Sequence, residues 1–147
     1  MKHVHKTVLI WYSPQEMYDL VTAVEDYPSF LPWCDSAQIV QRHDNGVTAR
    51  LGLSFAGVRN SFTTRNEHVP GRSVVVKLVD GPFSSLAGTW KFLPIKRQAQ
   101  ACKIDFDMRY VFANAPLEAL LSPMFDRIAN TFVDSFVSRA EAVHGAR

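Results

Sequence analysis

The sequence contains only two cysteines, Cys34 and Cys102, which lie far apart along its 147 residues. They form neither a CxxC pair nor a spacing typical of zinc sites, so the sequence indicates no disulfide framework and no structural zinc. A cysteine outside such motifs behaves as a small hydrophobic side chain and is usually buried. We therefore expect two buried thiols in a protein of a reducing compartment.

Long hydrophobic runs are also missing. No stretch reaches the roughly 18 apolar residues that a membrane-spanning helix needs. The apolar run at residues 8–12 is shorter than the core of a signal peptide, which has about 7–15 apolar residues before a small-residue cleavage site. The sequence predicts a cytoplasmic protein, with room for transient peripheral contact at the inner membrane.

No charge of one sign dominates, because sixteen lysines and arginines stand against fourteen aspartates and glutamates. The basic residues are scattered, and Lys96-Arg97 is the only adjacent pair. A dedicated nucleic-acid surface usually shows a basic stripe or cluster, so DNA is not an expected partner. The length fits one domain, residues 1–147, with a core large enough to enclose a cavity.

Motifs of the common enzyme classes are absent: there is no HExxH, no GxSxG and no phosphate-binding glycine loop. His3 and His5 would share one face of a strand, but no third metal ligand is apparent. Asp105 and Asp107 also share a strand face, and basic neighbours at 103 and 109 are typical of a solvated surface. Cys34 lacks an evident base to activate it. The sequence thus predicts a non-enzyme without metal or cofactor.

Residues 3–11 have the pattern of a strand with apolar side chains on both faces. The segment 13–16 has the features of a helix start: a capping serine, then proline, then glutamate three residues after the cap. We expect a short helix there, followed by a second one where prolines at 28 and 32 break the chain. The inward face of the first helix is predicted to comprise Met17, Leu20, Val21 and Val24.

From residue 36 to 112 the sequence indicates about six strands. Turn signals separate them at residues 44–46, 56–57, 70–72 and 80–82. In the last strand, apolar side chains from Cys102 to Phe112 alternate with mostly charged ones. This alternation is typical of an antiparallel sheet with one face exposed to water.

A long helix ends the chain, with apolar residues at steps of three and four from Leu117 to Phe136. Pro116 lies near its start, and Pro123 predicts either a kink or the true beginning of the helix. Strands segregated from helices indicate an α+β fold. A curved antiparallel sheet of six to seven strands, wrapped around this C-terminal helix, would bury both apolar faces. Any gap between the two would be an apolar cavity.

Four groups of residues, spread over positions 4–145, resemble one known family. They are the stretch Tyr27-Pro28-Ser29-Phe30-Leu31-Pro32-Trp33-Cys34; the stretch Phe62-Thr63-Thr64-Arg65-Asn66; the segment Leu78-Val79-Asp80-Gly81-Pro82-Phe83 continued by Leu86, Gly88, Trp90, Lys91 and Phe92; and Phe132, Phe136, Arg139 and Ala140. Together they resemble the START-like coenzyme Q-binding family of the polyketide cyclase and lipid transport superfamily. The second stretch is similar to the family's branch of bacterial ribosome-association toxins.

The resemblance implies a helix-grip fold and a cavity for ubiquinone or a similar prenyl lipid, held as a ligand. It also implies either support of respiratory electron transfer or interference with ribosomal subunit joining. Polar tips at Trp33, Arg65 or Tyr110 could orient a quinone head. The side chains predicted to bind the ligand are Tyr27, Phe30, Leu31, Trp33, Phe55, Phe62, Arg65, Trp90, Phe92, Phe106, Met108, Tyr110, Phe112, Met124, Ile128 and Phe132.

The loop at residues 27–34 is unusually apolar for a loop. It could be a hydrophobic plug over the sheet, a gate to the cavity, or a foot that dips into a membrane to collect lipid. If it is a gate or foot, Trp33→Ala should weaken lipid transfer more than it lowers stability. Equal losses would favour the plug.

Three functions fit the sequence. The first is a lipid carrier or chaperone, which needs no catalytic residue. The second is an inhibitor that binds a ribosomal subunit through a basic outer patch, built from Arg59, Arg65, Arg72, Lys77 and Lys91. The third is a polyketide cyclase or aromatase, which would need a positioned polar group deep in the cavity.

Overall fold

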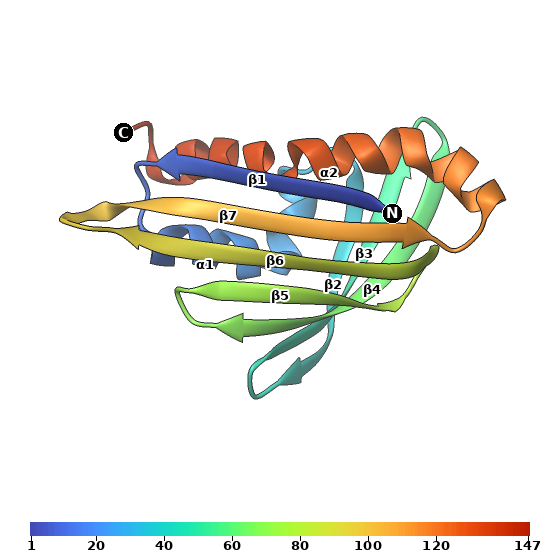
Figure 1. Cartoon of the computed structure of the whole chain (residues 1–147), viewed down its shortest axis with the longest axis horizontal. Helices are drawn as coiled ribbons and strands as arrows, with labels where there is room; N and C mark the ends of the chain where they lie inside the picture. The colour runs from blue at the N-terminus through green and yellow to red at the C-terminus, as the bar shows by residue number, and fades with distance from the viewer.

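The computed structural model describes residues 1–147 and contains one antiparallel sheet, two short helical segments and one long helix (Figure 1). In chain order these are β1 (Lys2–Ile10), α1 (Pro14–Thr22), the 3-10 helix η1 (Val24–Ser29), β2 (Cys34–His43), β3 (Gly46–Phe55), β4 (Val58–Val69), β5 (Ser73–Asp80), β6 (Phe83–Ile95), β7 (Gln98–Phe112) and α2 (Ala115–His144). The seven strands lie in the order β1-β7-β6-β5-β4-β3-β2. The predicted α+β helix-grip architecture is confirmed.

The start of α1 follows from its local sequence. Ser13 accepts a hydrogen bond from the Glu16 amide at 3.1 Å, and Glu16 accepts one from the Ser13 amide at 2.9 Å. These two bonds satisfy backbone donors that the first turn of a helix leaves free, as the capping-box motif predicts. Met17 and Val21 then face the core, together with Tyr18, which the predicted inward face did not include.

The predicted turns separate the strands where glycine or asparagine allows the chain to reverse. β2 ends at His43 and β3 begins at Gly46, and the β3–β4 turn uses Ala56 and Gly57 with φ of 51° and 82°. The β6–β7 hairpin was not among the predicted turns. It reverses at residues 96–97 without glycine, because Arg97 adopts a φ of 66°.

The helix α2 starts at Ala115, where the side chain of Asn114 accepts a hydrogen bond from the Leu117 amide at 2.9 Å. Pro123 lies within the continuous helix, so it does not mark the start. Neither α1 nor α2 combines the length and the apolar character that crossing a bilayer would require.

The sheet curves around the inner side of α2, and the core lies between them (Figure 1). β1 and β7 pair in register from Lys2–Tyr110 to Ile10–Cys102, so the N-terminal strand lies beside the last one. Ion pairs then tie β1 to the helix: Lys2 to Asp126 at 2.9 Å and Lys6 to Asp134 at 3.0 Å. This arrangement fixes α2 over the concave face of the sheet and positions the cavity described next.

Candidate ligand-binding cavity

A cavity of about 80 Å³ lies between the concave face of the sheet and α2, and 15 of its 18 lining residues are hydrophobic. Every strand from β3 to β7 contributes to the wall, and α1, η1 and α2 close it. The lining residues are Val21, Tyr27, Trp33, Leu51, Phe62, Thr64, Asn66, Val74, Val76, Leu86, Gly88, Trp90, Phe106, Met108, Phe125, Ile128, Ala129 and Phe132.

Two of the lining residues are small, one on the sheet and one on α2. Gly88 on β6 has no side chain, and Ala129 on α2 carries only a methyl group. A side chain at Gly88 would first touch Asp107 and Met108, at 3.6 and 3.7 Å from its Cβ, so the glycine is not needed for backbone clearance. Its effect is to leave room inside an otherwise close-packed core.

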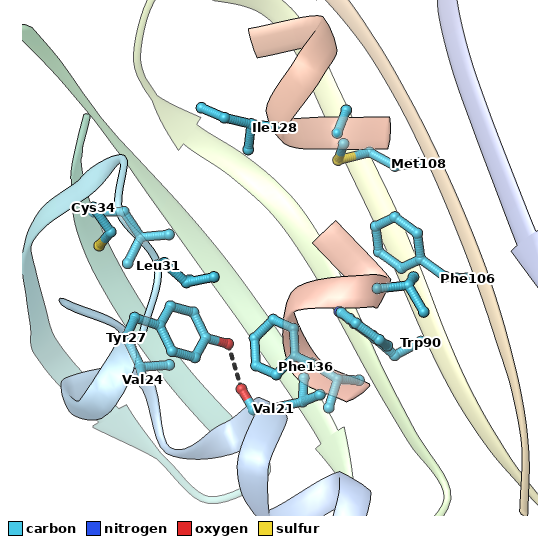
Figure 2. Close-up of a cluster of buried hydrophobic side chains, with 14 of the residues drawn as sticks. Val21, Val24, Tyr27, Leu31, Cys34, Trp90, Phe106, Met108, Ile128 and Phe136 are labelled. Atoms are coloured by element: carbon cyan, nitrogen blue, oxygen red, sulfur yellow. Dashed lines mark hydrogen bonds between the residues drawn. The ribbon is translucent and has the colours of Figure 1, made fainter. Parts of the chain in front are cut away.

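Half of the side chains that were predicted to bind a ligand line this cavity. They are Tyr27, Trp33, Phe62, Trp90, Phe106, Met108, Ile128 and Phe132. Figure 2 shows several of them converging from η1, β6, β7 and α2. Their direct role in binding remains a prediction.

Arg65 and Phe55 do not line the cavity, and their predicted contact with the ligand is corrected. Arg65 lies on β4 between Thr64 and Asn66, which point inward, so its own side chain points to the solvent on the opposite face. Phe55 stands at the end of β3, beside the β3–β4 turn, and is 46% exposed because no element covers it there. Arg65 therefore cannot orient a head group inside the sheet.

Tyr110, Phe112 and Met124 are buried, but they fill a neighbouring part of the core and do not line the cavity. Tyr110 and Phe112 pack against Phe125, with ring centroids 4.8 and 6.2 Å away. The Tyr110 hydroxyl donates to Asp126 at 2.5 Å. Burial and this carboxylate raise the pKa of Tyr110. The hydroxyl is thus bonded to α2 in this structure, and contact of Tyr110, Phe112 and Met124 with the ligand stays a prediction.

Phe30, Leu31 and Phe92 are also absent from the lining. Phe92 packs its ring edge-on against Tyr18, with centroids 6.1 Å apart, at the α1 end of the core. Phe30 packs against Phe136 on α2 at 5.2 Å, and Leu31 is fully buried. These three side chains fill the core around the cavity, and their contact with the ligand stays a prediction.

The segment 27–34, which we call the lid segment, packs inward against α2. Tyr27, Leu31 and Trp33 are buried. The Tyr27 hydroxyl donates to the Val21 carbonyl (Figure 2), and burial raises the pKa of Tyr27. The ring of Trp33 lies 6.1 Å from that of Phe132 on α2. In this structure the lid segment packs inward as a hydrophobic plug, forms part of the cavity wall and exposes none of these three side chains. Its role as a gate stays a prediction.

Two polar lining residues were missed by the sequence reasoning. Thr64 and Asn66 are 4% and 8% exposed, and the Thr64 hydroxyl donates to the Asn66 side-chain oxygen at 2.8 Å. The signal that could have found them is the alternation of β4. Phe62 faces the core, so residues two and four positions later share its face.

Both thiols are buried and free, as expected. The Cys34 thiol donates to the Ser36 carbonyl at 3.2 Å, and burial raises the pKa of Cys34 to about 11. Burial likewise raises the pKa of Cys102 to about 12. Since the thiolate is the reactive form of cysteine, neither residue is activated as a nucleophile.

The histidines and aspartates of the outer sheet face pair with one another. His3 contacts Asp107 at 2.8 Å and His5 contacts Asp105 at 2.6 Å, between β1 and β7. These contacts lower the pKa of both carboxyls. No group of three or more metal-ligating side chains occurs. The four side chains lie on the outer face of the sheet, on the side away from the cavity.

Similarity to known proteins places this geometry in a family. The chain is 38% identical over 147 residues to the ribosome association toxin RatA of Escherichia coli K12, covering 100% of this chain and 92% of that protein. It is 26% identical over 139 residues to the mitochondrial coenzyme Q-binding protein COQ10 homolog B of Xenopus laevis, covering 93% of this chain and 57% of that protein. The fold matches the Zhui aromatase/cyclase of Streptomyces sp. R1128 with a TM-score of 0.83 at 17% identity, over 99% of both chains.

Residues 10–137 match the family model described as polyketide cyclase / dehydrase and lipid transport. The match covers most of the chain, and it agrees with the sheet, the long helix and the apolar cavity between them. The chain therefore belongs to the START-like polyketide cyclase / dehydrase and lipid transport family.

Proposed function

We propose that this protein binds an isoprenoid quinone, ubiquinone or a close relative, in the cavity and acts as its carrier. The observation that carries the proposal is the lining: 15 of 18 residues are hydrophobic, and they come from five strands, α1, the lid segment and α2. Each buried methylene of a prenyl chain would contribute about 0.8 kcal/mol before the costs of binding. The name of the coenzyme Q-binding relative supports the same ligand class.

The cavity has to widen before such a ligand fits. Its volume is about 80 Å³, whereas pockets for drug-sized ligands span about 300–1,000 Å³. Phe132 is the part of the wall best placed to move, because it is only partly buried and faces Trp33 of the lid segment. If these two rings moved apart, the cavity would open to solvent between the lid segment and α2.

The lining favours a carrier over a cyclase. A cyclase that moves protons needs a titratable group positioned at the substrate. Tyr27 is the single titratable side chain among the lining residues, and its hydroxyl already donates to the Val21 carbonyl. The polar atoms of Thr64 and Asn66 can hydrogen-bond a ligand but do not exchange protons near neutral pH.

Tryptophan fluorescence tests the proposal directly, because Trp33 and Trp90 line the cavity. Trp11 is 58% exposed, so the variant Trp11→Phe removes the background of the third tryptophan. A short-chain ubiquinone should quench this variant saturably at one molecule per chain. Mass spectrometry under native conditions should show the same stoichiometry. Quenching that rises linearly without saturation, with no bound species in the mass spectrum, would refute the proposal.

A second candidate function is association with a ribosomal subunit. It is supported by the E. coli relative's name and by basic side chains on the outer sheet face. Arg65 and Lys77 are direct cross-strand partners, and Ala87 separates Lys77 from Arg109 in the same row. Arg59 is paired with Asp35 at 3.1 Å and Arg109 with Asp107 at 3.6 Å, so Arg65 and Lys77 form the part of the row without an acidic partner. The test is sedimentation of ribosomal subunits in a sucrose gradient with added protein. A lower yield of joined ribosomes is expected, and an unchanged profile would refute this candidate.

A further inference from the structure

The cavity wall contains one polar pair in an apolar setting, Thr64 and Asn66 on β4. Their exposed fractions are 4% and 8%. Asn66 is paired in register with Val47 on β3 and Val76 on β5, so its cross-strand neighbours are apolar. Burying a carboxamide among apolar groups is costly unless its polar atoms are hydrogen-bonded. An asparagine at this position therefore needs a reason beyond packing.

The hydrogen bonding leaves the Asn66 side-chain nitrogen free. A carboxamide offers one acceptor oxygen and two N–H donors. The Thr64 hydroxyl donates to the oxygen at 2.8 Å, which fixes the orientation of the side chain. The nitrogen has no hydrogen-bond partner in the protein, and it is not sealed in the core. The only fully enclosed polar side-chain atom without a partner is Nε2 of His68, and that residue lies outside the lining.

Trp90 lines the same wall from β6, but its indole ring packs edge-on against Phe136 on α2, with ring centroids 5.3 Å apart. The donor that the cavity presents without a protein partner is therefore the side-chain nitrogen of Asn66. Donors without acceptors match a ligand that carries acceptor oxygens, such as carbonyl groups.

We propose that Asn66, oriented by Thr64, is the residue that recognises a carbonyl oxygen on the head group of the ligand. The inference rests on the proposed binding of a prenylated quinone, whose ring carries such oxygens. Asn66 determines specificity, because it raises the affinity for a ring that carries carbonyl groups above the affinity for an equally apolar molecule without oxygens. The apolar remainder of the wall binds the prenyl chain and does not discriminate between the two.

The test compares two probes on two proteins. The probes are a short-chain ubiquinone and a prenylbenzene with the same side chain but no ring oxygens. Wild-type protein should bind the quinone about tenfold more tightly than the prenylbenzene, which is the size of effect that one or two hydrogen bonds give in a dry site. Asn66→Leu keeps the branched shape of the side chain and removes the donors. It should bind both probes equally, with its prenylbenzene affinity unchanged or increased.

Thr64→Val is the second variant, and the inference can be tested with it if Asn66→Leu does not fold. It keeps the amide but removes the hydroxyl that orients it, so the preference for quinone should fall by a few-fold. Equal affinity of wild type for both probes, or an unchanged quinone preference in Asn66→Leu and Thr64→Val, would overturn the inference while leaving quinone binding intact. If wild type binds neither probe, the proposed function fails, and the inference fails with it.

Discussion

At the scale of single residues, Glu16 connects the two ends of the chain. Its side chain accepts a hydrogen bond from the Ser13 amide in the capping box. It also accepts two hydrogen bonds from Arg147, at 2.7 and 2.9 Å. His144 on the last turn of α2 lies 3.5 Å away. The guanidinium of Arg147 is the main cause that lowers the pKa of Glu16 to about 2. One carboxylate therefore caps α1 and holds it to the end of α2.

This pKa predicts how stability depends on pH. A carboxyl whose pKa is lower in the folded state stabilises the fold above its unfolded pKa, and the stabilisation is lost as the pH falls through the folded pKa. The unfolded value is about 4.3, so for Glu16 the loss falls between about pH 5 and pH 2. Glu16→Gln should lower the unfolding free energy by about 1 kcal/mol at pH 7, after allowance for solvent screening.

Urea unfolding at pH 7, 5 and 3 measures the effect, and the difference between Glu16→Gln and wild type should shrink as the pH falls. Glu25→Gln is the matched control, because Glu25 forms only an exposed pair with Arg42 at 3.6 Å. It should change the unfolding free energy by less than about 0.5 kcal/mol at any of these values. A constant difference between wild type and Glu16→Gln across the series would contradict the role of the charge.

At the scale of elements, local signals in the sequence were sufficient to predict most of the helices, strands and turns. The Ser13 cap, the glycine turns and the alternation of β7 each depend on neighbouring residues, and each was found where predicted. The β6–β7 hairpin was missed because Arg97 adopts a left-handed conformation that no side-chain signal marks. Local sequence is informative where the chain carries a residue with a conformational preference of its own.

The cavity depends on features that alternation does not provide. Alternation distinguishes the two faces of β4, and a strict count by two from Phe62 would have chosen Asn66 and rejected Arg65. It does not say which inward side chains touch one another and which face a gap. Phe92 and Trp90 both point inward from β6, yet only Trp90 lines the cavity. That difference is set by the position of α1 and α2, which is a long-range property.

The contact between the lid segment and α2 gives a prediction about ligand uptake. Phe132 is partly buried and faces Trp33 and Trp90, with centroid distances of 6.1 and 5.7 Å. Phe132→Ala should enlarge the opening and increase the rate of quinone uptake several-fold. Its cost in unfolding free energy should be about 1–2 kcal/mol, below the roughly 3–5 kcal/mol of a fully buried phenylalanine. Stopped-flow quenching and urea unfolding measure the two quantities.

The matched control is Phe112→Ala on β7. Phe112 is buried and packs against Phe83 and Phe125 at 5.2 and 6.2 Å, away from the lid segment, so its removal should cost the full amount and leave uptake by the folded fraction unchanged. If Phe132→Ala lowers stability without changing uptake, the ring belongs to the core and does not gate the cavity. Trp33 is both buried and cavity-lining, so Trp33→Ala tests the two roles together.

At the scale of the whole molecule, the two candidate functions use opposite faces of one sheet. The concave face and α2 enclose the apolar cavity, whereas the convex face carries Arg65, Lys77 and Arg109 in one cross-strand row. The formal net charge is only +2, so long-range attraction to an anionic partner depends on this local row and not on the chain as a whole. The two candidate sites therefore do not overlap.

Salt separates the two functions, because burial of apolar surface is insensitive to ionic strength and attraction to phosphate is not. Between 50 and 200 mM salt, quinone affinity should change by less than about twofold. Association with ribosomal subunits through three basic side chains should weaken by about tenfold or more. The double variant Arg65→Glu and Lys77→Glu should abolish subunit association and leave quinone quenching unchanged, since both side chains point away from the cavity. Salt-independent subunit association, or retention of it in the double variant, would show that the convex row is not the contact and would move the search to the cavity side of the molecule.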